Sequence, residues 1–119
     1  MERRIYLASP YTSPNEDVRI SRYGTACLVT AQMLKKGLLV FSPIVHGHPL
    51  ASYGLPVEFD FWQRYCLSFL ESWATELCVL TIPGWESSRG VKAEIQFAQE
   101  RDMPVFLLSL LGHMEPFHG

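Results

Sequence analysis

The sequence predicts an α/β fold in which a parallel sheet is covered by helices on both faces. Short runs that are apolar throughout alternate with longer segments of helical periodicity, in the order β-α-β-α-β-α-β. Strands without polar alternation are typical of parallel sheets that are buried on both sides. With 119 residues, the chain is long enough to form one domain with a substantial core.

The composition excludes several classes of protein. A hydrophobic fraction of 48% and a charged fraction of 18% are typical of a compact globule. The net charge of −2 predicts no basic face, so a nucleic acid polymer is not an expected partner. Three cysteines without C-x-x-C spacing argue against a disulfide framework or a zinc site and fit a reducing cytoplasm. No apolar run fits a signal peptide or a membrane span, so no membrane partner is expected.

The first strand and helix are predicted from residues 4–9 and 13–37. The run RIYLAS is apolar and ends in small residues. Ser13 as N-cap, Pro14 at the first helical position and Glu16 three residues after the cap indicate a capping box. Two lysines and Gly37 are typical of a helix end. Between these two ends of the predicted helix, apolar residues recur at helical spacing: Ile20, Tyr23, Cys27, Ala31 and Leu34.

Three further strands and two further helices follow. Residues 43–57 hold three prolines and two glycines and predict a loop. The expected strands are 38–42, 76–82 and 104–110, the expected helices are 58–74 and 88–102, and residues 108–119 are expected to form a loose tail. The helix over 58–74 carries Phe61, Tyr65, Phe69 and Trp73 on one side.

A binding crevice is expected at one edge of the sheet. In open parallel sheets, ligands bind outside the carboxyl ends of the strands. Residues 9–13, 42–48 and 83–90 follow the first three strands and should meet there.

Glu94 is the most informative residue of the expected crevice. It falls among the apolar positions of its helix, beside Val91, Ile95 and Ala98. It also lies about one turn after the helix start, where the helix dipole favours a carboxylate. The position predicts a charged carboxylate that points into the crevice, and the alternative is a partly solvated helix glutamate.

The loop GWESSRG precedes that helix. Gly84 and Gly90 permit tight backbone, and Ser87 and Ser88 place hydroxyls beside free helix amides. Such a helix start binds anions, phosphate included. Ser88 can equally serve as a helix cap, and the two roles are compatible. The loop matches neither a P-loop nor G-x-G-x-x-G, so neither an ATPase nor a dinucleotide enzyme is indicated.

The runs IYLASPY, VFSPIVHGHPLA and VLTIPGWESSRGVKAEIQFA resemble the nucleoside 2-deoxyribosyltransferase-like superfamily, and most of all its short bacterial and phage members. The resemblance covers about residues 4–108, and its most specific part is S-x-G-x-x-x-E-x-x-x-A, here Ser88, Gly90, Glu94 and Ala98. It implies a flavodoxin-like three-layer sandwich with a parallel sheet of four to five strands, in a single domain over residues 1–119.

The resemblance also implies a chemistry. The glutamate at the position of Glu94 is the nucleophile that attacks the anomeric carbon of a deoxyribose and displaces the base. Water then resolves the covalent sugar in hydrolases, and a second base does so in transferases. Tyr6 would orient the glutamate, and Ser88 would hold the phosphate of a 5′-monophosphate. A carboxylate suits this reaction because it stabilises, or bonds to, an oxocarbenium-like sugar.

One expected residue is missing from the sequence. Relatives carry an aspartate in a D-x-x-x-L-x-x-A-D-like run before the third strand, whereas this chain reads YCLSFLESWATEL. The leaving base needs a proton or a hydrogen-bond donor, usually from a second acid. Asp60, Glu71 and Glu76 are the alternatives, and Asp60 is the one included among the catalytic candidates. The missing acid favours a rival function, a nucleotide sensor that uses the same pocket without turnover.

The remaining candidates would bind substrate. Ser9, Pro10 and Tyr11 would line the sugar or base, and Trp85 could pack on the ligand. Ser42, His46 and His48 belong to the segment after the second strand, and the two histidines are too few for a closed metal site. The resemblance implies no metal or cofactor and predicts a homodimer or a higher homo-oligomer. The aromatic side of residues 58–74 is the expected interface.

Overall fold

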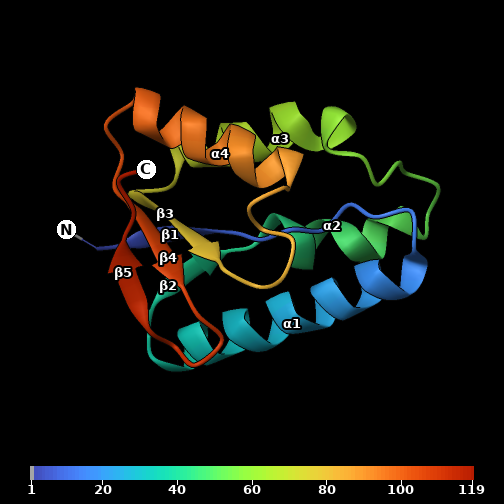
Figure 1. Cartoon of the computed structure of the whole chain (residues 1–119), viewed down its shortest axis with the longest axis horizontal. Helices are drawn as coiled ribbons and strands as arrows, with labels where there is room; N and C mark the ends of the chain where they lie inside the picture. The colour runs from blue at the N-terminus through green and yellow to red at the C-terminus, as the bar shows by residue number, and fades with distance from the viewer. Residues whose placement is uncertain (1) are drawn as a thin grey trace.

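The computed structural model describes residues 2–119 and contains one mixed sheet with helices on both faces (Figure 1). The elements in chain order are β1 (Arg4–Ala8), α1 (Glu16–Lys35), β2 (Leu39–Phe41), α2 (Pro43–Ala51), α3 (Phe59–Ser72), β3 (Glu76–Leu80), α4 (Arg89–Glu100), β4 (Val105–Leu108) and β5 (Met114–Pro116). The strand order is β2-β1-β3-β4-β5, with the first four strands parallel and β5 antiparallel to β4. The predicted three-layer α/β sandwich is confirmed.

The strands are buried on both faces, as their apolar runs predict. Along β1, Tyr6 and Ala8 belong to the core that includes residues of α3 and α4, whereas Ile5 and Leu7 belong to the core beneath α1. Neighbouring residues point to opposite faces of a strand, so each strand contributes to both cores. The two cores fix α3 and α4 on one face of the sheet and α1 on the other (Figure 1).

The start of α1 differs from the prediction. Asn15 is the N-cap, and its side chain accepts a hydrogen bond from the Asp17 amide at 2.8 Å. The Ser13 hydroxyl instead accepts from the Asn15 amide at 3.1 Å, which closes a turn before the helix. Asparagine caps a helix as well as serine does, and Pro14 lies before the cap instead of inside the helix.

The buried face of α1 is formed by Ala26, Val29, Thr30 and Met33. The apolar positions that marked this helix in the sequence lie largely elsewhere, since Ile20 and Leu34 are about half exposed. The helix therefore has two apolar faces, of which one covers the sheet.

The segment after β2 is helical instead of a loop. The Ser42 hydroxyl caps α2 by accepting a hydrogen bond from the Val45 amide at 3.2 Å. Pro43 occupies the first helical position, where its fixed φ favours the helix and its missing N–H costs nothing. Pro49 lies inside α2 near its end. Proline content alone therefore misassigned residues 43–51, because a capped proline starts a helix.

The tail is also ordered by the sheet. Met114–Pro116 form β5, and the Phe117 amide donates to the Val105 carbonyl at 2.8 Å. The Phe117 ring packs edge-on against Trp85, with the ring centroids 6.2 Å apart. The prediction of a loose tail is wrong, because Met114 and Phe117 anchor the segment.

Candidate functional site

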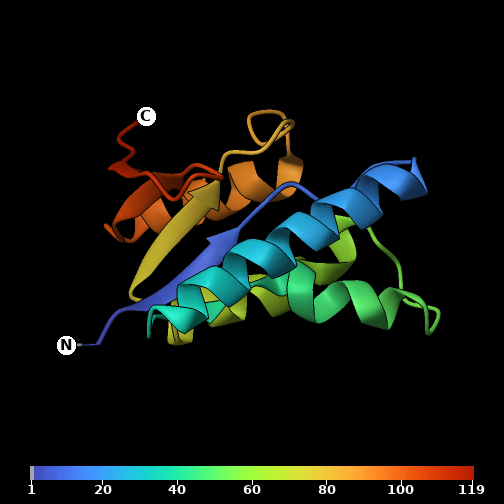
Figure 2. The same cartoon turned by 90° about the horizontal axis from the view of Figure 1, so that it is seen from below.

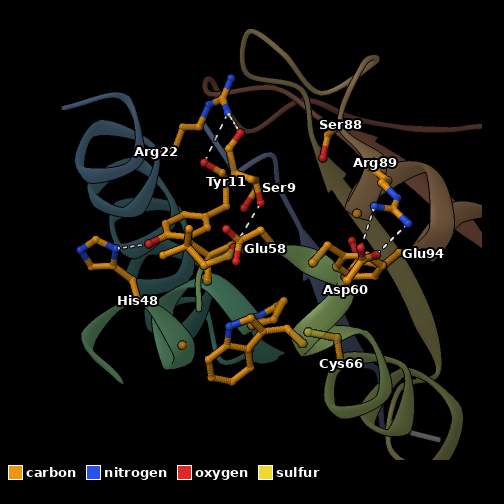
Figure 3. A pocket seen from close by; sticks show the side chains of 18 of the residues that line it. Ser9, Tyr11, Arg22, His48, Glu58, Asp60, Cys66, Ser88, Arg89 and Glu94 are labelled. Atoms are coloured by element: carbon orange, nitrogen blue, oxygen red, sulfur yellow. Dashed lines mark hydrogen bonds and ion pairs between the residues drawn. The ribbon is translucent and has the colours of Figure 1, made fainter. Parts of the chain in front are cut away.

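A cavity of about 400 Å³ opens at the carboxyl end of β1, where the loop after β1, α2, the start of α3 and the start of α4 meet (Figure 3). This is the edge of the sheet at which the strand order predicts a ligand site. The volume is typical of small-molecule sites. Many of the lining residues are apolar, and the polar ones come from separate segments.

Glu94 and Tyr6 form the buried polar centre of this cavity. The Tyr6 hydroxyl, from β1, donates a hydrogen bond to the carboxylate of Glu94, in the second turn of α4. Glu94 is 4% exposed and Tyr6 is fully buried, but Glu94 still lines the cavity. The structure thus brings the two residues together as the sequence predicts.

Burial controls the charge of Glu94. Desolvation raises the pKa of the Glu94 carboxyl to about 8, and the hydrogen bond from Tyr6 opposes this rise without cancelling it. The sequence predicted a carboxylate that keeps its charge, and this is so only above about pH 8. Burial, together with the Glu94 carboxylate, also raises the pKa of Tyr6 well above its usual value, so Tyr6 remains a hydrogen-bond donor.

Cys66 of α3 lies beside this pair and was missed by the sequence reasoning. Its side chain is buried and lines the cavity. Burial, with a smaller contribution from Glu94, raises the pKa of the thiol to about 12, so Cys66 is neither a thiolate nor a nucleophile. No sequence motif marked Cys66, because its place beside Glu94 depends on how α3 packs against α4.

The start of α4 forms the second polar part of the cavity. The Ser88 hydroxyl accepts a hydrogen bond from the Val91 amide at 3.2 Å, so Ser88 is the helix cap. The Ser87 hydroxyl donates to the Gly84 carbonyl at 3.3 Å. Gly84 and Gly90 also line the cavity, and a Cβ on Gly90 would lie 3.0 Å from the Phe59 ring. Gly90 is therefore required for close packing of α4 against the start of α3.

Arg22 of α1 supplies a cation that the motif analysis did not find. One guanidinium nitrogen donates to the Thr12 carbonyl at 3.1 Å and, over 3.4 Å, to the Tyr11 carbonyl. The other nitrogen, Nη2, lies 2.4 Å from where a Cβ on Gly84 would stand. Gly84 also has φ +98°, which favours glycine. The loop that carries Ser87 and Ser88 is thus in contact with Arg22.

The loop after β1 lines the cavity through Ser9 and Tyr11. Ser9 is 6% exposed, and within residues 2–119 its hydroxyl makes no hydrogen bond. The Tyr11 hydroxyl is hydrogen-bonded to Nδ1 of His48 at 2.6 Å (Figure 3). The Tyr23 ring stacks on the same imidazole, with the ring centroids 4.1 Å apart. Pro10, which lies between Ser9 and Tyr11, is fully buried and does not line the cavity.

Two acidic residues lie at the rim of the cavity. Asp60 pairs with Arg89 across the gap between α3 and α4, with 2.7 Å between Oδ1 and Nη2 (Figure 3). Glu58, which the sequence reasoning missed, lines the same cavity as the N-cap of α3, and its side chain makes no capping hydrogen bond. Of the three acids left open by the sequence, only Asp60 lies here. Glu71 pairs with Arg101, and Glu76 pairs with Arg3 at the start of β3.

Three other predicted binding residues lie outside the cavity lining. Ser42 is buried as the cap of α2, and His46 bonds to the Tyr65 hydroxyl at 2.8 Å. Trp85 packs against Phe117 and lines a separate hollow beside α4. Neighbours in sequence can therefore face different sides, as His46 and His48 do on α2.

Within residues 2–119, no three histidine, cysteine or acidic side chains group closely enough to hold a metal ion. Over the same residues, the helices are too short or too polar to cross a membrane.

Comparison with known proteins gives a family but no activity. No curated protein matches the chain. Residues 3–110 match the family described as "Domain of unknown function (DUF1937)". The match covers every element up to β4, including both parts of the candidate site. The chain therefore belongs to the DUF1937 family.

Proposed function

We propose that this protein cleaves or transfers the N-glycosidic bond of a (deoxy)nucleoside or its 5′-monophosphate, with Glu94 as the nucleophile. The observation that carries the proposal is the buried hydrogen bond from Tyr6 to the Glu94 carboxylate at the floor of a ligand-sized cavity. A buried carboxylate held in one orientation, and open to a cavity on one side, is what attack on an anomeric carbon requires.

The reaction proceeds in two displacements. A Glu94 oxygen bonds to the anomeric carbon while the carbon–nitrogen bond to the base breaks and its electron pair leaves with the base. Water then attacks the same carbon in hydrolysis, or a second base does so in transfer, and Glu94 is released. The positive charge that develops on the sugar favours the ionised carboxylate, which counteracts the effect of burial on its pKa.

The start of α4 is suited to a 5′-phosphate. Backbone amides at a helix start bind anions, and the Ser88 hydroxyl still has a proton to donate after accepting from Val91. The Arg22 guanidinium lies against the same loop and adds a positive charge. These groups favour a monophosphate over an unphosphorylated nucleoside.

The departing base would take its proton from an acid at the cavity rim. Glu58 and Asp60 both line the cavity, but Asp60 is already paired with Arg89. We assign the proton to Glu58. The apolar part of the cavity wall, which includes Ile44 and Trp62, would hold the base.

The alternative function is a nucleotide sensor that binds the same ligands without turnover. The thiol of Cys66, in the run where relatives carry an aspartate, and the raised pKa of Glu94 both favour this alternative. Near neutral pH, the Cys66 thiol and the Glu94 carboxyl are therefore both uncharged before a ligand binds.

A panel of nucleosides and 5′-monophosphates, incubated at about pH 7 and about pH 9 with chromatography for free base, separates the two functions. Glu94→Gln is the matched control, since glutamine keeps an acceptor for the Tyr6 hydroxyl but cannot form the glycosyl ester. Base release by the wild type alone supports the enzyme. Tight binding without release supports the sensor, and an absence of both would overturn the proposal.

A further inference from the structure

The outer face of α1 carries an apolar stripe that the rest of the described chain leaves uncovered. Ile20, Leu28 and Leu34 are 50%, 57% and 51% exposed, respectively. Gly24 and Ala31 lie between them and are also exposed. Seen from below, α1 crosses the front of the molecule along almost its whole length (Figure 2). This face lies opposite the one that packs on the sheet, so it is not part of the core.

The stripe carries no charged side chain along its length, whereas the two ends of α1 are charged. Arg19 and Arg22, the charged residues nearest the middle of α1, both donate hydrogen bonds to carbonyls of the preceding loop. The remaining charges are acidic in the first turn, at Glu16 and Asp17, and basic at the end, at Lys35 and Lys36. A solvent-exposed helix usually carries charges along its length, so this distribution needs an explanation.

The stripe is complementary to itself when two copies run antiparallel. With the two-fold axis at Cys27, Ile20 faces Leu34 of the second copy, and Tyr23 faces its Ala31. The small residues Gly24 and Ala31 allow two helices to approach closely. The acidic first turn of each helix then lies beside the basic last turn of the other.

We infer that this stripe is the interface of a homodimer in which α1 packs antiparallel on α1 of a second copy, about an axis near Cys27. A two-fold axis uses one patch on both copies, and the opposite charges at the two ends of a single helix satisfy that requirement. A parallel pair would place like charges together at both ends. The interface rests mainly on one helix about 30 Å long, so its size predicts a dimer that dissociates on dilution.

Sedimentation equilibrium over about 1–100 μM tests the state of the wild-type protein. Ala31→Glu buries a charge in the stripe and should raise the dimer dissociation constant by about 100-fold or more. Phe61→Glu, at a 51% exposed position on the aromatic side of α3 that the sequence favoured as the interface, is the matched control and should leave the constant unchanged. Circular dichroism checks that both variants fold. A wild type that stays monomeric, or a dimer lost only in Phe61→Glu, would overturn the inference.

Two further measurements address the axis and the charges. Oxidation should join two copies through Cys27, which is partly exposed, and Cys27→Ser should abolish the product, because Cys66 and Cys78 are buried. A Glu16→Lys, Asp17→Lys variant and a Lys35→Glu, Lys36→Glu variant should each dimerise weakly and should form a heterodimer when mixed. If mixing the two variants does not increase dimer formation, the charge pairing is contradicted.

A lipid surface is the rival occupant of the stripe. Binding of the monomer to phosphatidylcholine–phosphatidylglycerol vesicles, lost in Ala31→Glu, would assign the stripe to a lipid surface instead.

Discussion

The Tyr6 hydroxyl donates a hydrogen bond to the Glu94 carboxylate across 88 positions of sequence, and neither side chain is more than 4% exposed. This bond ties β1 to α4 at the floor of the cavity and fixes one carboxylate oxygen. Burial raises the pKa of Glu94 to about 8, and Tyr6 acts in the opposite direction. The proposed reaction needs the ionised form, so the environment of this one bond should control its pH dependence.

The first prediction concerns that pH dependence. For a substrate whose base leaves readily without a proton from Glu58, kcat/KM for base release should rise with pH and level off above about pH 8, because it reports the ionisation of Glu94 in the free enzyme. Initial rates at low substrate concentration across a pH series measure it. Glu94→Gln should show no base release at any pH. A profile that is already flat from about pH 5 would mean that another group with an ordinary carboxyl pKa is the nucleophile.

The second prediction is that the free energy of unfolding falls as the pH rises, whereas kcat/KM increases. The folded-state pKa of Glu94, about 8, lies above its ordinary value of 4.5, so between these values the folded protein binds one more proton than the unfolded chain. The contribution of Glu94 to the free energy of unfolding should therefore be largest below about pH 4.5. It should fall by at most about 1.4 kcal/mol per pH unit as the pH rises to about 8. Urea titrations of wild type and Glu94→Gln measure the difference, and the variant should lack this contribution. Parallel curves for the two proteins would show that Glu94 titrates normally.

The sequence predicted the sheet and the place of Glu94 at the crevice because both depend on local signals, whereas only the resemblance implied that Tyr6 pairs with Glu94. Apolar runs mark buried parallel strands, and a lone carboxylate among apolar helix positions marks a crevice. It did not predict α2, since proline counts suggest a loop unless the cap Ser42 is recognised. It also missed Arg22, Glu58 and Cys66. Their placement depends on how α1 and α3 pack at the cavity, which no local pattern encodes.

Tyr6→Phe should slow the chemical step and move the pH profile. Loss of the donated hydrogen bond removes the interaction that lowers the pKa of Glu94, so the plateau should begin at a higher pH than in the wild type. The buried carboxyl loses its partner, which should also cost about 1–3 kcal/mol of stability. We expect kcat to fall by about 10- to 100-fold with a smaller change in KM. A lower kcat without any shift of the profile would assign Tyr6 to packing alone.

Gly84→Ala tests the arginine beside the loop before α4. A Cβ there would stand 2.4 Å from Nη2 of Arg22, so the guanidinium must move away from the loop. Affinity for 5′-monophosphates should fall by about 10-fold or more, while affinity for unphosphorylated nucleosides changes little. Gly54→Ala is the matched control, since Gly54 also has a positive φ, of +93°, but its Cβ would meet open space. Isothermal titration of both ligand classes makes the comparison, and equal losses for both classes would argue against an anion site at Arg22.

The last prediction separates the two acids at the cavity rim. Asp60 is held by Arg89 in an exposed ion pair, whereas the Glu58 side chain makes no capping bond and lines the cavity. A proton donor to the leaving base contributes about 10²- to 10⁴-fold, so Glu58→Gln should lower kcat by an amount in that range. Asp60→Asn should have a smaller effect, and its loss of an exposed ion pair should cost less than about 1 kcal/mol of stability. Single-turnover base release by each variant, with substrates whose bases differ in leaving ability, makes the comparison. The defect of Glu58→Gln should be largest for the poorest leaving group, because that base depends most on protonation. The reverse ranking of the two variants would move the proton donor to Asp60, and unchanged rates in both would mean that the base departs with a proton from water.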